Sequence, residues 1–253
     1  MNFIRFLKNP LFSIQKVGRD IQRPLFIKRY TKKIANRRTK IKASENLDEL
    51  YVDTRHLIED DVVKIKNISL KILSMIDYLA QKYDFQYFLA YGTLIGVIRH
   101  QGFIPWDDDI DIMMTPNNLD KFIEVCHELP ESVEFFPHGL NILKVMDRYS
   151  KISIDGKRGV AIDIFLLSES SGDFEFVNVH TQKIIKLKRS DIFPIKLMNF
   201  ENREVPVPAK YHEILTNIYG NYMKLPPVEK RVSHHVNNTS VHIESFSKPI
   251  TNH

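Results

Sequence analysis

Four carboxylates fall within five residues of this chain, at Asp107, Asp108, Asp109 and Asp111. They lead into the apolar run IDIMM (residues 110–114), which turn-forming residues bound on both sides, and we expect this run to form a buried strand. Residues two apart in a strand lie about 6.6 Å from each other on one face. Asp109 and Asp111 should therefore share one face of a sheet, while Ile110 and Ile112 are buried on the other.

Crowded carboxylates repel one another, and a divalent cation relieves that repulsion most simply. Asp163 is the one charged residue of a second apolar run, VAIDIFLL (160–167). If the two strands are adjacent, Asp163 supplies an oxygen ligand from a second direction. Two alternatives stay open: the acidic run is a solvated loop with capping aspartates, and Asp163 faces solvent on a one-sided sheet. Asp107 and Asp108 either hold metal or only shape the loop.

A glycine-containing turn precedes the acidic run. We expect a buried strand in FQYFLAY (85–91), followed after Gly92 by a short helix in TLIGVIRH (93–100). Gly92 permits close approach of the backbone to a ligand, Thr93 offers a hydroxyl group, and free N–H groups at a helix N-terminus favour phosphate. Alone, the Gly-Thr pair is also typical of an ordinary tight turn. The order strand, turn, helix and acidic strand within 25 residues favours the phosphate site.

The rest of the chain mixes helical and strand patterns. Apolar residues at three- and four-residue steps predict one long amphipathic helix from about His56 to Tyr83, which would cover a sheet. Further elements are expected at 117–129 (a helix with an Asn cap), 141–147 and 150–155 (apolar segments), 194–208 (a hairpin) and 209–220 (a helix ended by Gly220). Short strands alternating with helices indicate an α/β or α+β sheet protein.

Composition excludes several classes of protein. With 43% apolar and 26% charged residues, the chain is neither collagen-like nor wholly disordered. Its single cysteine, Cys126, excludes an intramolecular disulfide and a cysteine-based zinc cluster. Residues 1–42 hold 13 Lys and Arg against Asp20 alone, whereas the remaining 211 residues hold 23 bases and 30 acids. Because the larger part is acidic, we expect no nucleic-acid partner.

The basic N-terminal arm is a separate question. Aromatic and aliphatic residues alternate with Lys and Arg throughout residues 1–42, and no stretch is apolar enough to span a bilayer. We expect neither a spanning helix nor a secretory signal. The pattern suits a helix that lies on an anionic membrane surface. A basic extension that packs on the domain, or contact with RNA or another acidic partner, stays an alternative.

The segment YGTLIGVIRHQGFIPWDDDIDIMM (91–114) closely resembles the signature of the LicD family, which includes the fukutin-type transferases. GVAIDIFLL (159–167) is similar to the family's second acidic strand. The segment 193–227, with its FP pair, hairpin and YG-x-YM-x-LPP run, resembles the C-terminal block, and Arg231, His234 and His235 fit the end of that block. The chain departs from the family after Asp163, where many relatives have proline and an acidic residue.

The resemblance implies a nucleotidyltransferase-like fold, with a mixed sheet flanked by helices. It also implies metal-dependent transfer of a substituted phosphate, most commonly phosphocholine, from a CDP-linked donor to a sugar hydroxyl. In that fold Gly92 and Thr93 match the phosphate-binding turn, and Asp109, Asp111 and Asp163 match the catalytic, metal-holding carboxylates. We expect Mg²⁺ or Mn²⁺ there, with Asp107 as a further ligand and Asp163 alternatively as general base.

Three residues near the turn complete the predicted donor site. Arg99 and His100 can meet phosphate, and Trp106 (or Tyr91) can stack on a base or enclose a trimethylammonium group, although a core role for Trp106 is favoured.

The expected organisation is a basic arm at 1–45, a catalytic domain at 46–235 and a tail at 236–253. The expected acceptor is a cell-surface glycan such as lipopolysaccharide, capsule or teichoic acid. We expect a cytoplasmic enzyme on the inner face of the cell membrane. Transfer of ribitol or glycerol phosphate, true nucleotidyl transfer, and a non-catalytic nucleotide-binding module stay alternatives.

Overall fold

The computed structural model describes residues 10–40, 43, 47, 60–139, 141–152, 159–178 and 181–231; within the first range, side chains are described from residue 23 to 39. The helices and 3₁₀ turns are α2 (Pro10–Lys40), α3 (Asp61–Tyr83), α4 (Tyr91–His100), α5 (Pro116–Val125), η3 (Cys126–Glu128), α6 (Arg189–Ile192), α7 (Tyr211–Tyr219) and η4 (Val228–Lys230). The strands are β1 (Phe88–Leu89), β2 (Ile110–Met114), β3 (Val133–Gly139), β4 (Ile142–Asp147), β5 (Ala161–Leu166), β6 (Ser168–Ser170), β7 (Asp173–Val177), β8 (Ile184–Leu187), β9 (Lys196–Phe200) and β10 (Arg203–Val207).

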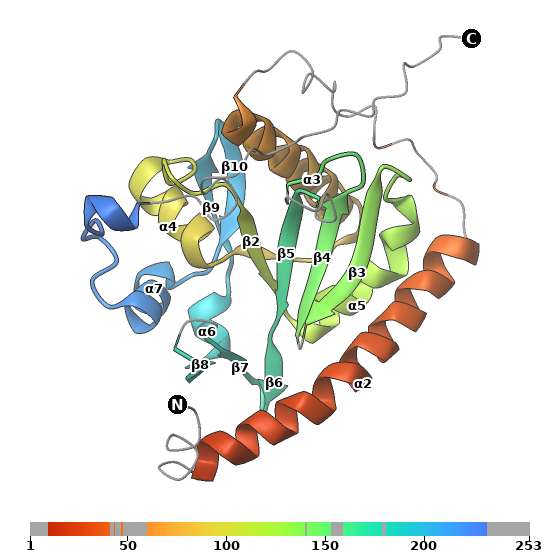
Figure 1. Cartoon of the computed structure of the whole chain (residues 1–253), viewed down its shortest axis with the longest axis horizontal. Coiled ribbons are helices and arrows are strands. Elements are labelled where there is room, and N and C mark those ends of the chain that lie inside the picture. The colour runs from red at the N-terminus through yellow and green to blue at the C-terminus, as the bar shows by residue number, and fades with distance from the viewer. Residues whose placement is uncertain are drawn as a thin grey trace.

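The central sheet has five strands in the order β1-β2-β5-β4-β3 (Figure 1). β2 and β5 run parallel and the other pairs are antiparallel, so the sheet is mixed. In the parallel pair, Ile110 lies opposite Ile162 and Asp111 lies opposite Asp163. The acidic strand and the second apolar strand, about fifty residues apart in the chain, are therefore neighbours.

The two faces of the sheet differ in chemistry because side chains alternate along each strand. Ile110, Ile112, Ile162 and Ile164 are fully buried in the main core, together with residues of α3 and α5. Asp111 and Asp163 stand on the opposite face, where Met113 joins a second core formed with α6, α7 and β7. The expected division into an apolar and an acidic face is present.

Local signals explain where α3 begins and ends. The side chain of Asp60 accepts hydrogen bonds from the backbone N–H groups of Val62 and Val63, so it caps α3. The helix ends at Asp84, which takes the left-handed conformation at φ 50°. The predicted start at His56 lies outside the described residues, and the end at Tyr83 is confirmed.

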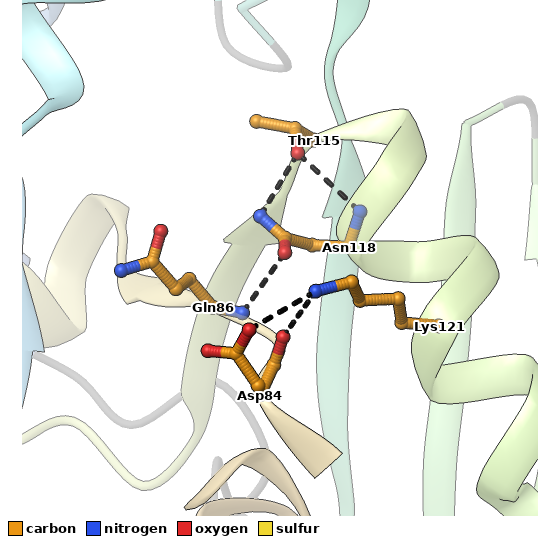
Figure 2. A network of polar contacts seen from close by, with 5 residues as sticks. All are labelled: Asp84, Gln86, Thr115, Asn118 and Lys121. Atoms are coloured by element: carbon orange, nitrogen blue, oxygen red, sulfur yellow. Dashed lines mark hydrogen bonds and ion pairs between the residues drawn. The ribbon is translucent and has the colours of Figure 1, made fainter.

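Thr115, rather than an asparagine, caps α5. Its hydroxyl accepts hydrogen bonds from the backbone and side-chain nitrogens of Asn118, while Asn118 Oδ1 accepts one from the Gln86 backbone 3.0 Å away (Figure 2). Lys121 in turn contacts the backbone oxygen and carboxylate of Asp84. These hydrogen bonds connect α5 to Asp84 and Gln86, in the turn that leads from α3 into β1.

Two sequence expectations need correction. The strand predicted over 85–91 is only β1, two residues long, because it pairs solely with β2 at the edge of the sheet and α4 already begins at Tyr91. The predicted Asn cap of the helix at 117–129 is Thr115, and the helix ends at Val125 before η3. The strand at 110–114 is confirmed. The hairpin with its turn before Arg203 (β9, β10) and the helix ended by Gly220 are also confirmed.

The second half of α2 packs against the folded domain. Tyr30 and Ile34 are buried in the main core, and Arg38 donates hydrogen bonds of 3.0 Å to the carbonyl oxygens of Pro130 and Val133 beside β3. Lys33 and Arg37 pair with Asp120 and Glu124 of α5. Figure 1 shows α2 running along the β3 edge of the sheet. The packed unit thus extends N-terminal of the predicted boundary at residue 45.

Other predictions fall where the structure describes nothing. They include residues 1–9, the side chains of residues 10–22, His234 and His235, and the tail at 236–253. Over the ranges that are described, no helix is both long and apolar enough to cross a bilayer.

Candidate active site

Asp111 and Asp163 lie side by side on the face of the sheet that α3 and α5 leave uncovered. They are register partners on the parallel strands β2 and β5, so their side chains project in the same direction. Lys144, the register partner of Asp163 on β4, extends from this face as well, and its Nζ lies 2.6 Å from Asp163 Oδ1. The predicted carboxylates of Asp111 and Asp163 are therefore neighbours on one face of the sheet. Lys144, which was not predicted as a site residue, forms an ion pair with Asp163.

The acidic loop before β2 brings further carboxylates to the same place. Asp107 and Asp108 are buried, at 7% and 1% exposure, whereas Asp109 is only half-buried. Asp107 Oδ1 is enclosed without a hydrogen-bond partner among the described residues. A Cβ at Gly92 would approach Asp107 Oδ2 to 2.6 Å. Glycine at position 92 thus leaves the space that the Asp107 carboxylate occupies.

The pKa values show how closely these carboxyl groups interact. Burial is the main cause that raises the pKa of Asp111 well above its ordinary value. Neighbouring carboxylates raise it further; they are Asp109, Asp163 and Asp107. The Lys144 ammonium group acts in the opposite direction. Burial and the adjacent Asp109 likewise raise the pKa of Asp107 to about 8. The site thus concentrates negative charge that the protein itself only partly neutralises.

The predicted Gly-Thr turn is tied directly to the acidic strand. Thr93 is buried, and its hydroxyl oxygen accepts a hydrogen bond of 2.9 Å from the backbone N–H of Asp111. The backbone N–H of Ala90, just before α4, donates to the carbonyl oxygen of Asp111. Both the backbone N–H and the carbonyl oxygen of Asp111 are therefore bonded to the start of α4, which lies beside the carboxylates. Thr93 positions Asp111, a role that its place in a turn did not indicate.

Two tyrosines border the carboxylates. Burial raises the pKa of Tyr91, the first residue of α4, and the charge of Asp111 raises it further. Burial also raises the pKa of Tyr219, at the end of α7, with further contributions from Asp111, Tyr91, Asp107 and Asp109. Tyr219 belongs to the C-terminal segment singled out in the sequence, but no local pattern placed it at this site. Lys144 left a signal, because it interrupts an apolar strand between Leu143 and Val145.

The other predicted site residues lie at the opposite end of α4 and in the loop that follows. Arg99 Nη1 donates to the carbonyl oxygen of Tyr222 at 3.0 Å, and burial lowers its pKa. His100 is exposed, and desolvation followed by the charge of Arg99 lowers its pKa. Trp106 is half-buried and packs against the main core, and the guanidinium of Arg231 lies 5.3 Å from the centroid of its ring. Among the described residues, none of these three side chains has a recorded hydrogen bond or ion pair with the carboxylates.

The carboxylates have the chemistry of a divalent-cation site. Within the described residues, no three His, Cys, Asp or Glu side chains are gathered closely enough to hold a metal ion together as they stand. The donor set nevertheless fits a hard cation such as Mg²⁺, because it consists of carboxylate oxygens and includes the enclosed, unpartnered Asp107 Oδ1. Asp107, Asp109, Asp111 and Asp163 are the residues that would hold such an ion.

Comparison with known proteins shows that the segment containing these residues matches a protein family. The family described as "LicD/FKTN/FKRP, nucleotidyltransferase domain" matches residues 84–210, which span the turn, the acidic strand and Asp163. Lipopolysaccharide cholinephosphotransferase LicD of Haemophilus influenzae is 27% identical over 248 residues, covering 67% of this chain and 94% of that protein. An uncharacterised protein of Rickettsia typhi is 30% identical over 131 residues, 51% of this chain and 38% of its own.

Among solved structures, the chain is similar to the lincomycin-bound lincosamide antibiotic adenylyltransferase LnuA. The sequence identity is 17% and the TM-score is 0.37, over 62% of this chain and 88% of that one.

Proposed function

The chain belongs to the LicD/FKTN/FKRP nucleotidyltransferase-domain family, and we propose that, as a phosphotransferase of this family, it transfers phosphocholine from CDP-choline to a sugar hydroxyl. The proposed acceptor is a cell-surface glycan, with lipopolysaccharide as the first candidate because the H. influenzae relative is named for that substrate. Transfer of ribitol or glycerol phosphate from the corresponding CDP-alcohol is the variant closest to this proposal.

One observation carries the proposal: Asp111 and Asp163 are register partners on adjacent parallel strands, and the charges of Asp107 and Asp109 act on the same point. Attack on a diphosphate requires its negative charge to be offset. A bound Mg²⁺ or Mn²⁺ would supply that positive charge. The four carboxylates are the groups on this chain that can hold it.

The remaining residues have roles in binding and orientation. The first turn of α4, which includes Gly92 and Thr93, presents backbone N–H groups to a phosphate beside the carboxylates. Arg99 and His100 supply positive or hydrogen-bonding groups further along the same helix, and Trp106 supplies an aromatic ring directly before Asp107. Lys144 occupies Asp163 Oδ1, which leaves Oδ2 to complete the metal shell or to accept the proton of the attacking sugar hydroxyl.

A second function, nucleotidyl transfer, is favoured by the description of the matching domain. It would use the same carboxylates but attach the nucleotidyl group to the acceptor. The products separate the two: phosphocholine transfer releases CMP and leaves phosphocholine on the glycan, whereas nucleotidyl transfer leaves the nucleotide on the acceptor.

The proposed setting is the inner face of the cell membrane, reached through residues 1–42. Basic side chains recur along this arm, and each base near an anionic surface contributes about 1 kcal/mol of attraction. Part of that charge is already matched within the protein, because Lys33 and Arg37 face acidic residues of α5. Membrane contact would therefore depend on the other bases of the arm, of which Arg5, Lys8, Lys16 and Arg19 precede Arg23.

The test is incubation of the full chain with Mg²⁺ and a panel of CDP-linked alcohols, with and without candidate glycans, while CMP release is measured. We expect CMP release to depend on CDP-choline, on the metal and on the acceptor. Asp111→Asn should lower turnover by orders of magnitude, because it removes a charge from the centre of the site without changing shape. Glu204→Gln, an exposed carboxylate on β10, is the matched control and should keep full activity. Full activity of Asp111→Asn would refute the assignment.

A further inference from the structure

Two guanidinium groups lie near the last turn of α4 and act on each other electrostatically. Arg99 belongs to that turn, and Arg231 directly follows η4. The chain brings them together through the segment after α7, because Arg99 bonds the carbonyl oxygen of Tyr222 and Arg231 Nε donates to that of Pro226 at 2.9 Å. Figure 1 shows this blue segment returning to α4. The positive charge of Arg231 acts on Arg99 and lowers its pKa, after burial as the larger cause.

Neither arginine has a counter-ion in the part of the chain that the structure describes. Each side chain is bonded only to a neutral backbone carbonyl oxygen, and the Arg231 guanidinium rests on the Trp106 ring. Arg99 Nε is enclosed and without a hydrogen-bond partner among these residues. Two adjacent cations with an unused buried donor cost free energy, and a bound anion would remove that cost.

The position of this pair connects it with the candidate active site. Trp106, whose ring contacts the Arg231 guanidinium, directly precedes Asp107 in the acidic loop. Arg99 lies seven residues after Gly92 on α4, about 10 Å along the helix axis. A guanidinium group presents several N–H donors in one plane, a geometry that suits the oxygens of a phosphate group. A molecule that binds at the carboxylates and extends about 10 Å along α4 would place an anion at this pair.

We propose that Arg99 and Arg231 form a phosphate-binding site beside the carboxylates, and that Arg231, brought in by the segment after α7, is a substrate-binding residue. The site takes a phosphate oxyanion. That oxyanion has two sources, the diphosphate of the nucleotide donor and a phosphate group on the acceptor glycan. The choice between these sources rests on the proposed function, whereas the site itself rests on the two arginines.

The experiment measures binding to the full chain by calorimetry. The probes are CDP, cytidine, glucose 6-phosphate, glucose and inorganic phosphate, each at low and raised ionic strength. Arg231→Gln is expected to weaken the binding of phosphate-bearing probes by roughly ten- to a hundredfold. It should leave the binding of cytidine and glucose unchanged and reduce the dependence of binding on salt. Arg231→Lys, which keeps the charge but not the planar donors, should give an intermediate loss.

Lys230→Gln is the matched control, because it removes an equal charge from the neighbouring exposed residue and should leave binding unchanged. Thermal unfolding of each variant shows that the fold is retained. A loss for CDP assigns the site to the donor, and a loss for glucose 6-phosphate alone assigns it to the acceptor. If the chain binds inorganic phosphate through Arg231 but does not bind CDP, the site stands and the proposed donor fails. The site is refuted if Arg231→Gln binds every phosphate probe as tightly as the unaltered chain.

Discussion

Lys144 and Asp163 face each other across β4 and β5, with Nζ 2.6 Å from Oδ1. This ion pair lies beside Asp111, whose pKa the Lys144 ammonium lowers against the effect of burial and of three carboxylates. Among the described residues, Lys144 is thus a cation that lies beside the acidic groups of the site. It partly takes the place of a bound metal ion, and it orients one of the carboxylates that would hold that ion.

Replacing Lys144 by glutamine should separate these two effects. Without the ammonium group the carboxylates repel one another more strongly, so the metal-free protein should unfold at a lower temperature. The same change should increase the stabilisation gained on adding Mg²⁺, because the site becomes more negative. Turnover should fall at least tenfold at saturating metal, since Asp163 is no longer oriented. Thermal unfolding with EDTA and with Mg²⁺, alongside CMP release, measures all three effects.

Lys183→Gln, at an exposed position before β8, is the control for loss of a positive charge and should leave each measurement unchanged. A Lys144→Gln variant whose Mg²⁺ response matches that of the unaltered chain would show that Lys144 does not share the site with the ion.

Gly92→Ala should reduce activity through Asp107. The added Cβ would stand 2.6 Å from Asp107 Oδ2, so the carboxylate must move away from its present position. We expect turnover to fall at least tenfold, while the fold is kept because alanine is a good helix residue. Gly139→Ala in β3 is the matched control, since its Cβ would meet only Ile142 at ordinary contact distance. Equal activity of the two variants would contradict the role assigned to Gly92.

The alternation of apolar and polar residues within single strands was enough to predict which side chains share a face of the sheet. The run IDIMM fixes that Asp111 and Ile112 face opposite ways, and the structure confirms this division. No local pattern fixes which strands become neighbours. The register that sets Asp111 opposite Asp163, and the insertion of β4 next to β5, depend on packing between distant segments. The approach of Tyr219 to the carboxylates is hidden from the sequence for the same reason.

The arm shows why one pattern supports two interpretations. A helix with apolar residues on one side and bases on the other suits an anionic membrane, but it equally suits an acidic protein surface. Here α5 provides such a surface, with Asp120 and Glu124 facing Lys33 and Arg37 of α2. The sequence showed that the rest of the chain is acidic, but it did not show that the acids of α5 lie within reach of α2.

The stability of the metal-free protein should decrease as pH rises from about 4 to 8. Asp107 has a pKa of about 8 in the folded chain, whereas a carboxyl group of an unfolded chain has a pKa of about 4. In this range the folded state binds more protons than the unfolded state, so the free energy of unfolding falls by up to about 1.4 kcal/mol per pH unit for one such group. The raised pKa of Asp111 acts in the same direction.

Urea unfolding at a series of pH values in EDTA measures this slope. Asp107→Asn should make it shallower, and added Mg²⁺ should oppose it, because the ion binds the ionised carboxylates. A free energy of unfolding that rises with pH over this range would mean that these carboxyl groups are not held together in the folded chain.

Two truncations separate the structural role of α2 from its proposed membrane role. Deleting residues 1–42 removes the buried side chains of Tyr30 and Ile34 and the hydrogen bonds of Arg38, so the free energy of unfolding should fall by about 3 kcal/mol or more. Deleting residues 1–22 keeps all three and should leave the stability of the domain almost unchanged. Urea unfolding of the two truncated proteins and the full chain tests this difference.

The shorter truncation then isolates membrane binding. Because it keeps the segment docked on α5, any loss of sedimentation with phosphatidylglycerol vesicles reports the residues before Arg23 and not a damaged fold. We expect sedimentation to weaken, because four bases of the arm are removed, while CMP release with a water-soluble acceptor is kept. Vesicles of neutral lipid are the control and should retain neither protein. If the protein without residues 1–22 sediments as the full chain does, these residues do not contribute to membrane binding.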